Sequence, residues 1–238
     1  MFTTVLIDVD NTLLDFHKCS HASLRQGFAD FDLPWSDDFL SVFHTVNDGL
    51  WRQLESGEIK SRKDLFDIRF DRVFAAAGIR CDGKTFEARF QQLLTESHEP
   101  VDGALEALRY LAGKYTVCAA SNSAYEHQLH RLKAAGMLPY LSHVFVSEDI
   151  GATKPDPAFF RRCFERLGDP GKDSVVMIGD SLTADIAGAH AFGIQRAQNS
   201  DHGSRLRDPF RSVGGHHLLF PPSEQRHYFL FRLCRSKP

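Results

Sequence analysis

The hydrophobic and polar positions of the chain follow two patterns, one typical of buried strands and one typical of amphipathic helices. Short apolar runs rich in branched residues predict strands, and they lie at residues 5–7, 115–120, 143–147, 174–178 and, with a weaker pattern, 194–197. Segments with helical periodicity separate the later runs, at residues 104–113, 124–135, 157–167 and 183–192. Strands that alternate with helices of this length predict an α/β fold with a parallel sheet covered on both faces.

The stretch between residues 16 and 99 breaks this alternation. It holds amphipathic runs and no strand pattern, and glycines separate the runs as they do at helix ends; the runs are residues 20–31, 37–54, 61–77 and 84–97. An insert of roughly 80 residues is too long for a loop. We therefore expect a small helical domain, residues 16–99, over the carboxyl edge of a sheet domain formed by residues 1–15 and 100–238.

The composition excludes several classes of protein. The chain has 238 residues, of which 42% are hydrophobic and 25% charged, with a net charge of −3. Such a charge gives no reason to expect nucleic acid or an anionic membrane as the main partner, and no apolar run approaches the ~18 residues that cross a bilayer. The N-terminus lacks a signal-peptide pattern, and the five cysteines fit neither a zinc site nor a disulfide framework. We expect a cytoplasmic protein.

The last segment, residues 196–238, differs from the rest in charge. It carries eight Lys or Arg and three Asp or Glu. A basic tail docks a polyanion or is simply a solvated terminus, and the apolar residues 229–231 either pack back on the body or mediate self-association. The sequence leaves these alternatives open, and it does not indicate whether the chain is a monomer or a dimer.

Four carboxylates follow two of the predicted strands. Asp8 and Asp10 come directly after the first strand, Asp180 ends the strand at 174–178, and Asp185 follows shortly after it. Side chains two apart on an extended segment share a side, and open α/β sheets bind ligands at the carboxyl ends of their strands. Oxygen ligands of this kind suit Mg²⁺. For Asp185 alone, an acid favoured by the helix dipole is the simpler interpretation.

Two further strand ends carry polar groups suited to an anion. Lys154 lies in a segment stiffened by Pro155 and Pro157, where it can balance the acids and reach a phosphate oxygen; the alternative is a solvated loop lysine. Ser121 ends the strand at 115–120 and precedes a helix, so its hydroxyl can donate to an anion beside the N–H groups of the helix start. An ordinary helix cap is the competing interpretation, and it is the one that we prefer for Ser123.

These residues, taken in order, resemble the motifs of a haloacid dehalogenase superfamily phosphatase. The motifs are Asp8-Val9-Asp10-Asn11-Thr12, Ser121, Lys154-Pro155, and Gly179-Asp180 with Asp185, and the resemblance covers about residues 1–195. It implies a Rossmann-like core, and the helical insert is similar to the C1-type cap of that superfamily. Secondary matches at Gly57-Glu58-Ile59 and residues 146–151 favour the nucleotidase-like subfamily of pyrimidine-nucleotide phosphatases. The second motif reads Ser-Asn-Ser where Thr-Asn-Gly is more usual, and no clear closing strand and helix follow Gln195.

The resemblance also implies a role for each residue. Asp8 is the expected nucleophile, and Asp10 the acid that protonates the leaving group and then activates water. The expected Mg²⁺ ligands are Asp8, Asp10 through its carbonyl, and Asp180, with Asp185 orienting metal-bound water and Lys154. The groups expected to bind the substrate phosphate are Thr12, Ser121, Asn122 and Lys154.

The expected function is therefore hydrolysis of phosphomonoesters through an aspartyl-phosphate, with a nucleoside monophosphate or a similar small phosphorylated metabolite as substrate. A phosphomutase and a sugar-phosphate phosphatase are alternatives. A dehalogenase is less favoured, because a halide leaving group needs no acid at position 10, and a non-catalytic binding protein is also less favoured. Five aromatic or cationic residues of the insert are candidates for selecting the substrate, and the alternative for each is a place in the core or on the solvated surface. They are Phe16, His17, Lys60, Arg62 and Arg69. Trp35 and Trp51 are expected to pack within the cap.

Overall fold

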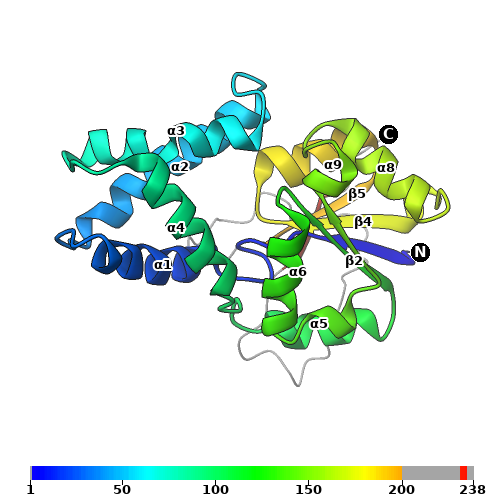
Figure 1. Ribbon diagram of the computed structural model, residues 1–238. Coiled ribbons are helices and arrows are strands. Elements are labelled where there is room, and N and C mark those ends of the chain that lie inside the picture. Colours follow the sequence, from blue (N-terminus) through cyan, green and yellow to red (C-terminus); the bar gives the residue numbers. More distant parts are fainter. Residues whose placement is uncertain (1, 200–230, 235–238) are drawn as a thin grey trace. The chain divides into compact units, whose positions relative to one another are not determined.

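The structure is a computed structural model that describes residues 2–199 and 231–234 (Figure 1). Residues 200–230 and 235–238 of the basic tail, and with them the question of whether the tail docks a polyanion, lie outside these residues. The contacts divide the chain into two compact units. The sheet unit comprises Met1–Leu14, Pro100–Tyr125 and Gly136–Pro238, and the helical unit comprises Asp15–Glu99 and Glu126–Ala135. No helix in the described part of the chain is long and apolar enough to cross a membrane.

The sheet unit is built on six strands in the order β3-β2-β1-β4-β5-β6. Their bounds are Thr4–Ile7 (β1), Thr116–Ser121 (β2), His143–Val146 (β3), Val175–Gly179 (β4), Gln195–Asn199 (β5) and Phe231–Cys234 (β6). The pairs among β1 to β5 are parallel, and β6 runs antiparallel to β5. The predicted α/β fold with a parallel sheet is confirmed, and β6 is a strand that the sequence pattern did not indicate.

Helices cover both faces of this sheet, with α5 (Ala104–Ala112) on one side and α8 (Pro157–Arg166) and α9 (Gly188–Phe192) on the other (Figure 1). Two short helices, η1 (Leu138–Tyr140) and η2 (Lys172–Ser174), precede strands, and α7 (Ser147–Ile150) follows one. The face toward α8 and α9 is closed by a core cluster that includes Leu6, Cys118, Phe145, Phe160 and Met177.

One predicted helix is divided into two parts. The pattern at 183–192 indicated a single helix, but residues Leu182–Ala187 form a π-helical turn, η3, before α9 begins. The Ser181 carbonyl accepts from the backbone N–H groups of both Asp185 and Ile186, each at 3.1 Å. This wider turn follows β4 directly, and such turns are frequent at functional sites.

The helical unit contains four helices from the predicted insert: α1 (Phe16–Asp30), α2 (Asp38–Glu55), α3 (Arg62–Ala77) and α4 (Gly83–Glu96). The sequence marks three of their starts, because the side chains of Asp15, Ser61 and Asp82 each accept a backbone N–H of the first turn. Gly78 ends α3 with a φ of 67°, a conformation that favours glycine.

Helix α6 (Tyr125–Ala134) groups mainly with the helical unit, although its pattern placed it in the sheet domain. His127 Nδ1 lies 2.7 Å from Thr95 Oγ1 at the end of α4, and Arg131 Nε donates to the Ser97 carbonyl at 2.9 Å. These contacts join α6 to the end of the insert. Side-chain contacts of this kind leave no periodicity in the sequence, which explains the difference.

A phenylalanine-rich core holds α1 to α4 together, and Arg69 is buried within it. The Arg69 guanidinium donates to both Glu87 carboxylate oxygens, at 2.6 and 2.9 Å, and to Asn47 Oδ1 at 3.1 Å. It also lies 4.8 Å from the Phe66 ring centre and 5.1 Å from that of Phe90. Of the alternatives that the sequence left open for Arg69, the structure supports the core residue and not the residue that selects substrate.

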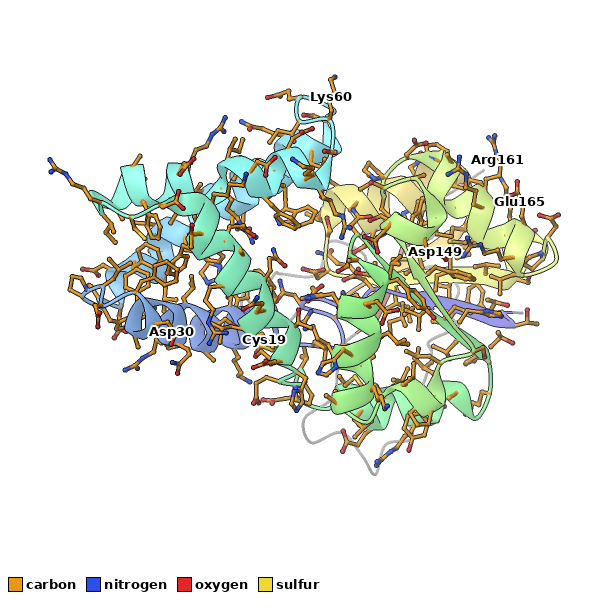
Figure 2. The ribbon with its side chains drawn as sticks, viewed as in Figure 1. Cys19, Asp30, Lys60, Asp149, Arg161 and Glu165 are labelled. Carbon is orange, nitrogen blue, oxygen red and sulfur yellow. The ribbon has the colours of Figure 1, made fainter. Side chains whose placement is uncertain are left out.

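The other aromatic and cationic candidates of the insert have identifiable surroundings. Trp35 stacks on His21 and meets Phe28 edge-on, as expected for cap packing, and Trp51 meets Phe66. Lys60, labelled in Figure 2, donates to the Gly57 carbonyl at 2.7 Å. For the remaining candidates, His17 Nδ1 lies 3.4 Å from His44 Nε2, Phe16 packs against the helical core, and Arg62 begins α3. Their contact with substrate stays a prediction.

Glu87→Ala is expected to lower the free energy of unfolding by about 3–5 kcal/mol, because it leaves the buried Arg69 charge without its carboxylate partner. Urea unfolding monitored by circular dichroism measures the change. The matched control is Asp67→Ala, which breaks the solvent-exposed pair with Lys63 on α3 and is expected to change stability little. Equal losses in the two variants would contradict the structural role given to the buried pair.

Candidate active site

Three acidic side chains meet at the carboxyl edge of the sheet. Asp8 follows β1, Asp180 follows β4, and Asp185 lies in η3. Each offers one carboxylate oxygen, and these oxygens all lie within 4.8 Å of one another. The register of the sheet explains the meeting, because Ile7 pairs with Ile178 and the Asp8 N–H donates to the Ile178 carbonyl at 2.8 Å. The fourth predicted acid, Asp10, is outside this group.

Lys154 supplies a positive charge to the acids. Its Nζ donates to Asp8 Oδ1 at 2.7 Å, to Asp185 Oδ1 at 2.6 Å and to the Ala120 carbonyl at 2.6 Å. An ammonium group has three protons, so these bonds use its whole donor capacity. The residue is only 2% exposed. The solvated-loop alternative for this lysine is therefore wrong.

Burial and mutual repulsion shape the protonation of this cluster. Burial raises the pKa of Asp8 well above its usual value, and the charges of Asp185 and Asp180 add to the effect, whereas Lys154 opposes it. Burial also raises the pKa of Asp180 to about 7, with a further contribution from Asp185 and a smaller one from Asp10. Burial alone would lower the pKa of Lys154, but the two carboxylates that it contacts raise it.

The charges around this edge do not balance. Asp8, Asp180 and Asp185 bring three carboxylates together, and Lys154 contributes one positive charge. A divalent cation would remove the remaining excess of negative charge, and carboxylate oxygens are the ligands that Mg²⁺ prefers. The residues present therefore fit a hard divalent metal ion.

Ser121 and Asn122 lie where the sequence placed them, at the end of β2 and directly after it. Ser121 is buried next to the Ala120 carbonyl that accepts from Lys154. The side chain of Asn122 pairs with the backbone of Lys154: Nδ2 donates to the Lys154 carbonyl at 2.9 Å, and Oδ1 accepts from the Lys154 N–H at 2.8 Å. Nothing in the sequence indicates this pairing beyond the tendency of Asn side chains to bond to backbone groups.

Thr12 lies in the turn that follows Asp10. Its side chain is fully buried, and its Oγ1 has no hydrogen-bond partner among the described residues. The turn itself is fixed by the Val9 carbonyl, which accepts from the N–H groups of Leu13 and Leu14, each at 2.8 Å. Asn11 has a φ of 57°, which Asn tolerates better than most residues. The predicted contact between Thr12 and substrate stays a prediction.

Gly179, which precedes Asp180 in the motif, is required for the geometry of the site. A Cβ at this position would lie 2.2 Å from Asp185 Oδ2 and 2.4 Å from its Cγ. Only a residue without a side chain lets the Asp185 carboxylate fold back against the end of β4, where its Oδ2 also accepts from the Ser181 N–H at 3.1 Å. The glycine therefore sets the position of one of the two carboxylates that hold Lys154.

Comparison with known families agrees with this arrangement. Residues 2–193 match the model of the haloacid dehalogenase-like hydrolases, and the chain belongs to this family of hydrolases. It is 34% identical over 193 residues to the HAD-hydrolase YfnB of Bacillus subtilis, with 81% of this chain and 82% of the relative covered. The crystal structure of YfnB bound to magnesium matches with a TM-score of 0.81 and 32% identity, over 86% of this chain and 92% of that one.

Two further relatives are named for an enzymatic activity. The chain is 33% identical over 199 residues to the pyrimidine 5'-nucleotidase PynA of Streptococcus pneumoniae, covering 83% of this chain and 84% of that protein. It is 28% identical over 190 residues to the pyrimidine 5'-nucleotidase YjjG of Escherichia coli, covering 80% and 82%. The L-2-haloacid dehalogenase of Xanthobacter autotrophicus is 18% identical with a TM-score of 0.63, over 84% of this chain and 78% of that one, and shares the fold alone.

Proposed function

We propose that this chain is a Mg²⁺-dependent phosphatase that hydrolyses small phosphomonoesters through a covalent phosphate on Asp8. The observation that carries the proposal is the buried cluster at the sheet edge, where Lys154 bridges Asp8 and Asp185 beside Asp180. A nucleophilic carboxylate beside a buried cation and a metal-ligating set is suited to attack on a phosphate, whose negative charge must be neutralised before a second anion approaches.

The reaction needs two steps, and the residues divide between them. In the first step an Asp8 oxygen bonds to phosphorus, the ester P–O bond breaks, and Asp10 gives its proton to the leaving alkoxide. In the second step water attacks the phosphorus of the aspartyl-phosphate, Asp10 takes the proton of that water, and the bond to Asp8 breaks. Phosphate is released, and both carboxyl groups return to their starting forms.

The metal-binding groups in this proposal are Asp8, Asp180 and the carbonyl of Asp10. When bound, Mg²⁺ supplies charge neutralisation at the transferring phosphoryl group. Asp185 Oδ1 accepts a hydrogen bond from Lys154 Nζ and so orients the Lys154 ammonium. Ser121 and the backbone N–H of Asn122 stand at the end of β2, where they are proposed to receive phosphate oxygens.

The proposed substrate class rests on the similarity of this chain to relatives with named substrates. The relatives named pyrimidine 5'-nucleotidases support a nucleoside monophosphate as the first candidate. A relative named phosphoserine phosphatase, 26% identical over 232 residues, supports a wider panel of small phosphomonoesters. In this proposal the helical unit is a C1-type cap, and the residues that select the substrate belong to it.

The test is phosphate release from a panel of nucleoside monophosphates, sugar phosphates and phosphoserine, each with Mg²⁺ and with EDTA. We expect release with Mg²⁺ that is abolished by EDTA, with pyrimidine monophosphates among the best substrates. Isomerisation of a sugar phosphate that conserves phosphate and requires a bisphosphate activator would instead identify a phosphomutase. Absence of both reactions across the panel would refute the proposed function.

A further inference from the structure

The end of β2 holds Lys154 at three points. The Ala120 carbonyl accepts from the Lys154 ammonium, and the Asn122 side chain bonds to both the N–H and the C=O of the Lys154 backbone. Ala120 and Asn122 are two residues apart, on either side of Ser121. One short stretch of chain therefore fixes both ends of the lysine, its backbone and its charged tip.

The geometry at Asn122 imitates a peptide group. A primary amide offers a donor and an acceptor on one plane, and here the donor meets the Lys154 carbonyl at 2.9 Å while the acceptor meets the Lys154 N–H at 2.8 Å. A serine side chain is too short to make both bonds, and aspartate, which has the same shape, lacks the donor. The backbone of a residue that is 2% exposed is satisfied in this way.

The loop that carries Asn122 is itself held in place by α7. The Ser123 carbonyl accepts from Ser147 Oγ and from the Glu148 N–H, each at 3.3 Å. The Glu148 carboxylate accepts from the Tyr125 N–H at 3.0 Å. These hydrogen bonds fix the loop that carries Asn122, so the Asn122 amide can hold the segment that contains Lys154 in one position.

We propose that Asn122 is a positioning residue whose side chain acts on the reaction through Lys154 and does not touch the substrate. This inference rests on the proposed phosphatase function. A lysine side chain is a flexible four-carbon stem, so the point where its ammonium lies depends on where its backbone is anchored. The ammonium must reach Asp8 and Asp185 together, at 2.7 and 2.6 Å. The amide of Asn122 sets that anchor.

The first test compares Asn122→Ala with wild type in steady-state kinetics on the best substrate of the panel. We expect kcat to fall by about 10- to 100-fold, as for a displaced catalytic group, while KM stays nearly constant. The matched control is Ser123→Ala, because Ser123 bonds to α7 through its backbone carbonyl, which alanine keeps. Its kcat should remain that of wild type.

The second test follows Lys154 itself and needs no activity. In protein labelled with ¹⁵N-lysine, a buried, fully bonded ammonium gives a distinct NMR signal, assigned through its loss in Lys154→Met. We expect this signal to shift or broaden in Asn122→Ala and to stay unchanged in Ser123→Ala. Asn122→Asp keeps the acceptor for the Lys154 N–H, so its kcat should lie between those of wild type and Asn122→Ala, and it replaces the alanine variant if that variant does not fold.

Three outcomes would overturn the inference. They are an unchanged kcat in Asn122→Ala, a rise in KM alone, or a loss of kcat with the Lys154 signal intact, since the last would mean that Asn122 contacts the substrate directly. A wild-type protein that releases no phosphate would refute the proposed function instead. The NMR comparison would still decide whether Asn122 positions Lys154.

Discussion

Asp8→Asn is expected to lower phosphate release by about 10³-fold or more, the size of loss that follows removal of a catalytic nucleophile. A carboxamide oxygen is a far poorer nucleophile toward phosphorus than a carboxylate oxygen, so the covalent intermediate cannot form. The change is otherwise small. Asn keeps an oxygen that can accept from the Lys154 ammonium, which donates to Asp8 Oδ1 at 2.7 Å in the wild type.

The same variant separates loss of chemistry from loss of fold. Burial raises the pKa of Asp8, so in the metal-free protein a charged Asp8 opposes folding near neutral pH. Replacing it by a neutral residue should leave the thermal midpoint unchanged or higher when no metal is present. Asp173→Asn, a change at an exposed position in η2, is the matched control and should keep full activity.

Release of phosphate and thermal unfolding, both measured with EDTA and with Mg²⁺, give the result. Substantial release from a folded Asp8→Asn protein, with deamidation excluded by mass spectrometry, would remove Asp8 from the role of nucleophile. A variant that is inactive and unfolded would contradict the expectation for stability.

The meeting of Asp8 and Asp180 could be predicted because it depends on sheet topology. Parallel strands end at one edge, and residues that directly follow neighbouring strands must lie near one another. The strand pattern was clear enough to indicate which runs are buried, since Leu6 and Met177 face one core cluster across the sheet. Once these residues are placed at the carboxyl edge of the sheet, their side chains indicate a site for a metal ion and an anion.

Other parts of the site depend on contacts that leave no periodic trace. The π-helical turn that aims Asp185 arises from how the Ser181 carbonyl shares two donors, and a helical pattern does not distinguish it from an ordinary helix. The pairing of Asn122 with the Lys154 backbone depends on the path of two loops that are distant in sequence. In the helical unit, the sequence leaves Arg69 as a specificity candidate, a core residue or a solvated surface residue. Its burial and its ion pair with Glu87 on α4 are visible only in the structure.

Gly179→Ala is the second change with a large expected effect. The added methyl group would lie 2.2 Å from Asp185 Oδ2, well inside the closest approach of real atoms. The Asp185 carboxylate must then move, and it loses its bonds to the Lys154 ammonium and the Ser181 N–H. Because misplacing a group by about 1 Å costs about 10²-fold in rate, we expect kcat to fall by at least that factor.

The matched control is Gly171→Ala, because a Cβ at Gly171 meets nothing within 4 Å and its φ is −59°. This control should keep its activity and its stability. In Gly179→Ala, forcing a carbon into a packed site should also lower the free energy of unfolding by about 1–3 kcal/mol. Kinetics at saturating Mg²⁺ and urea unfolding measure both effects. Wild-type kcat in Gly179→Ala would mean that the Asp185 carboxylate can leave the end of β4 without disturbing Lys154, so the position of Asp185 would not be what limits the reaction.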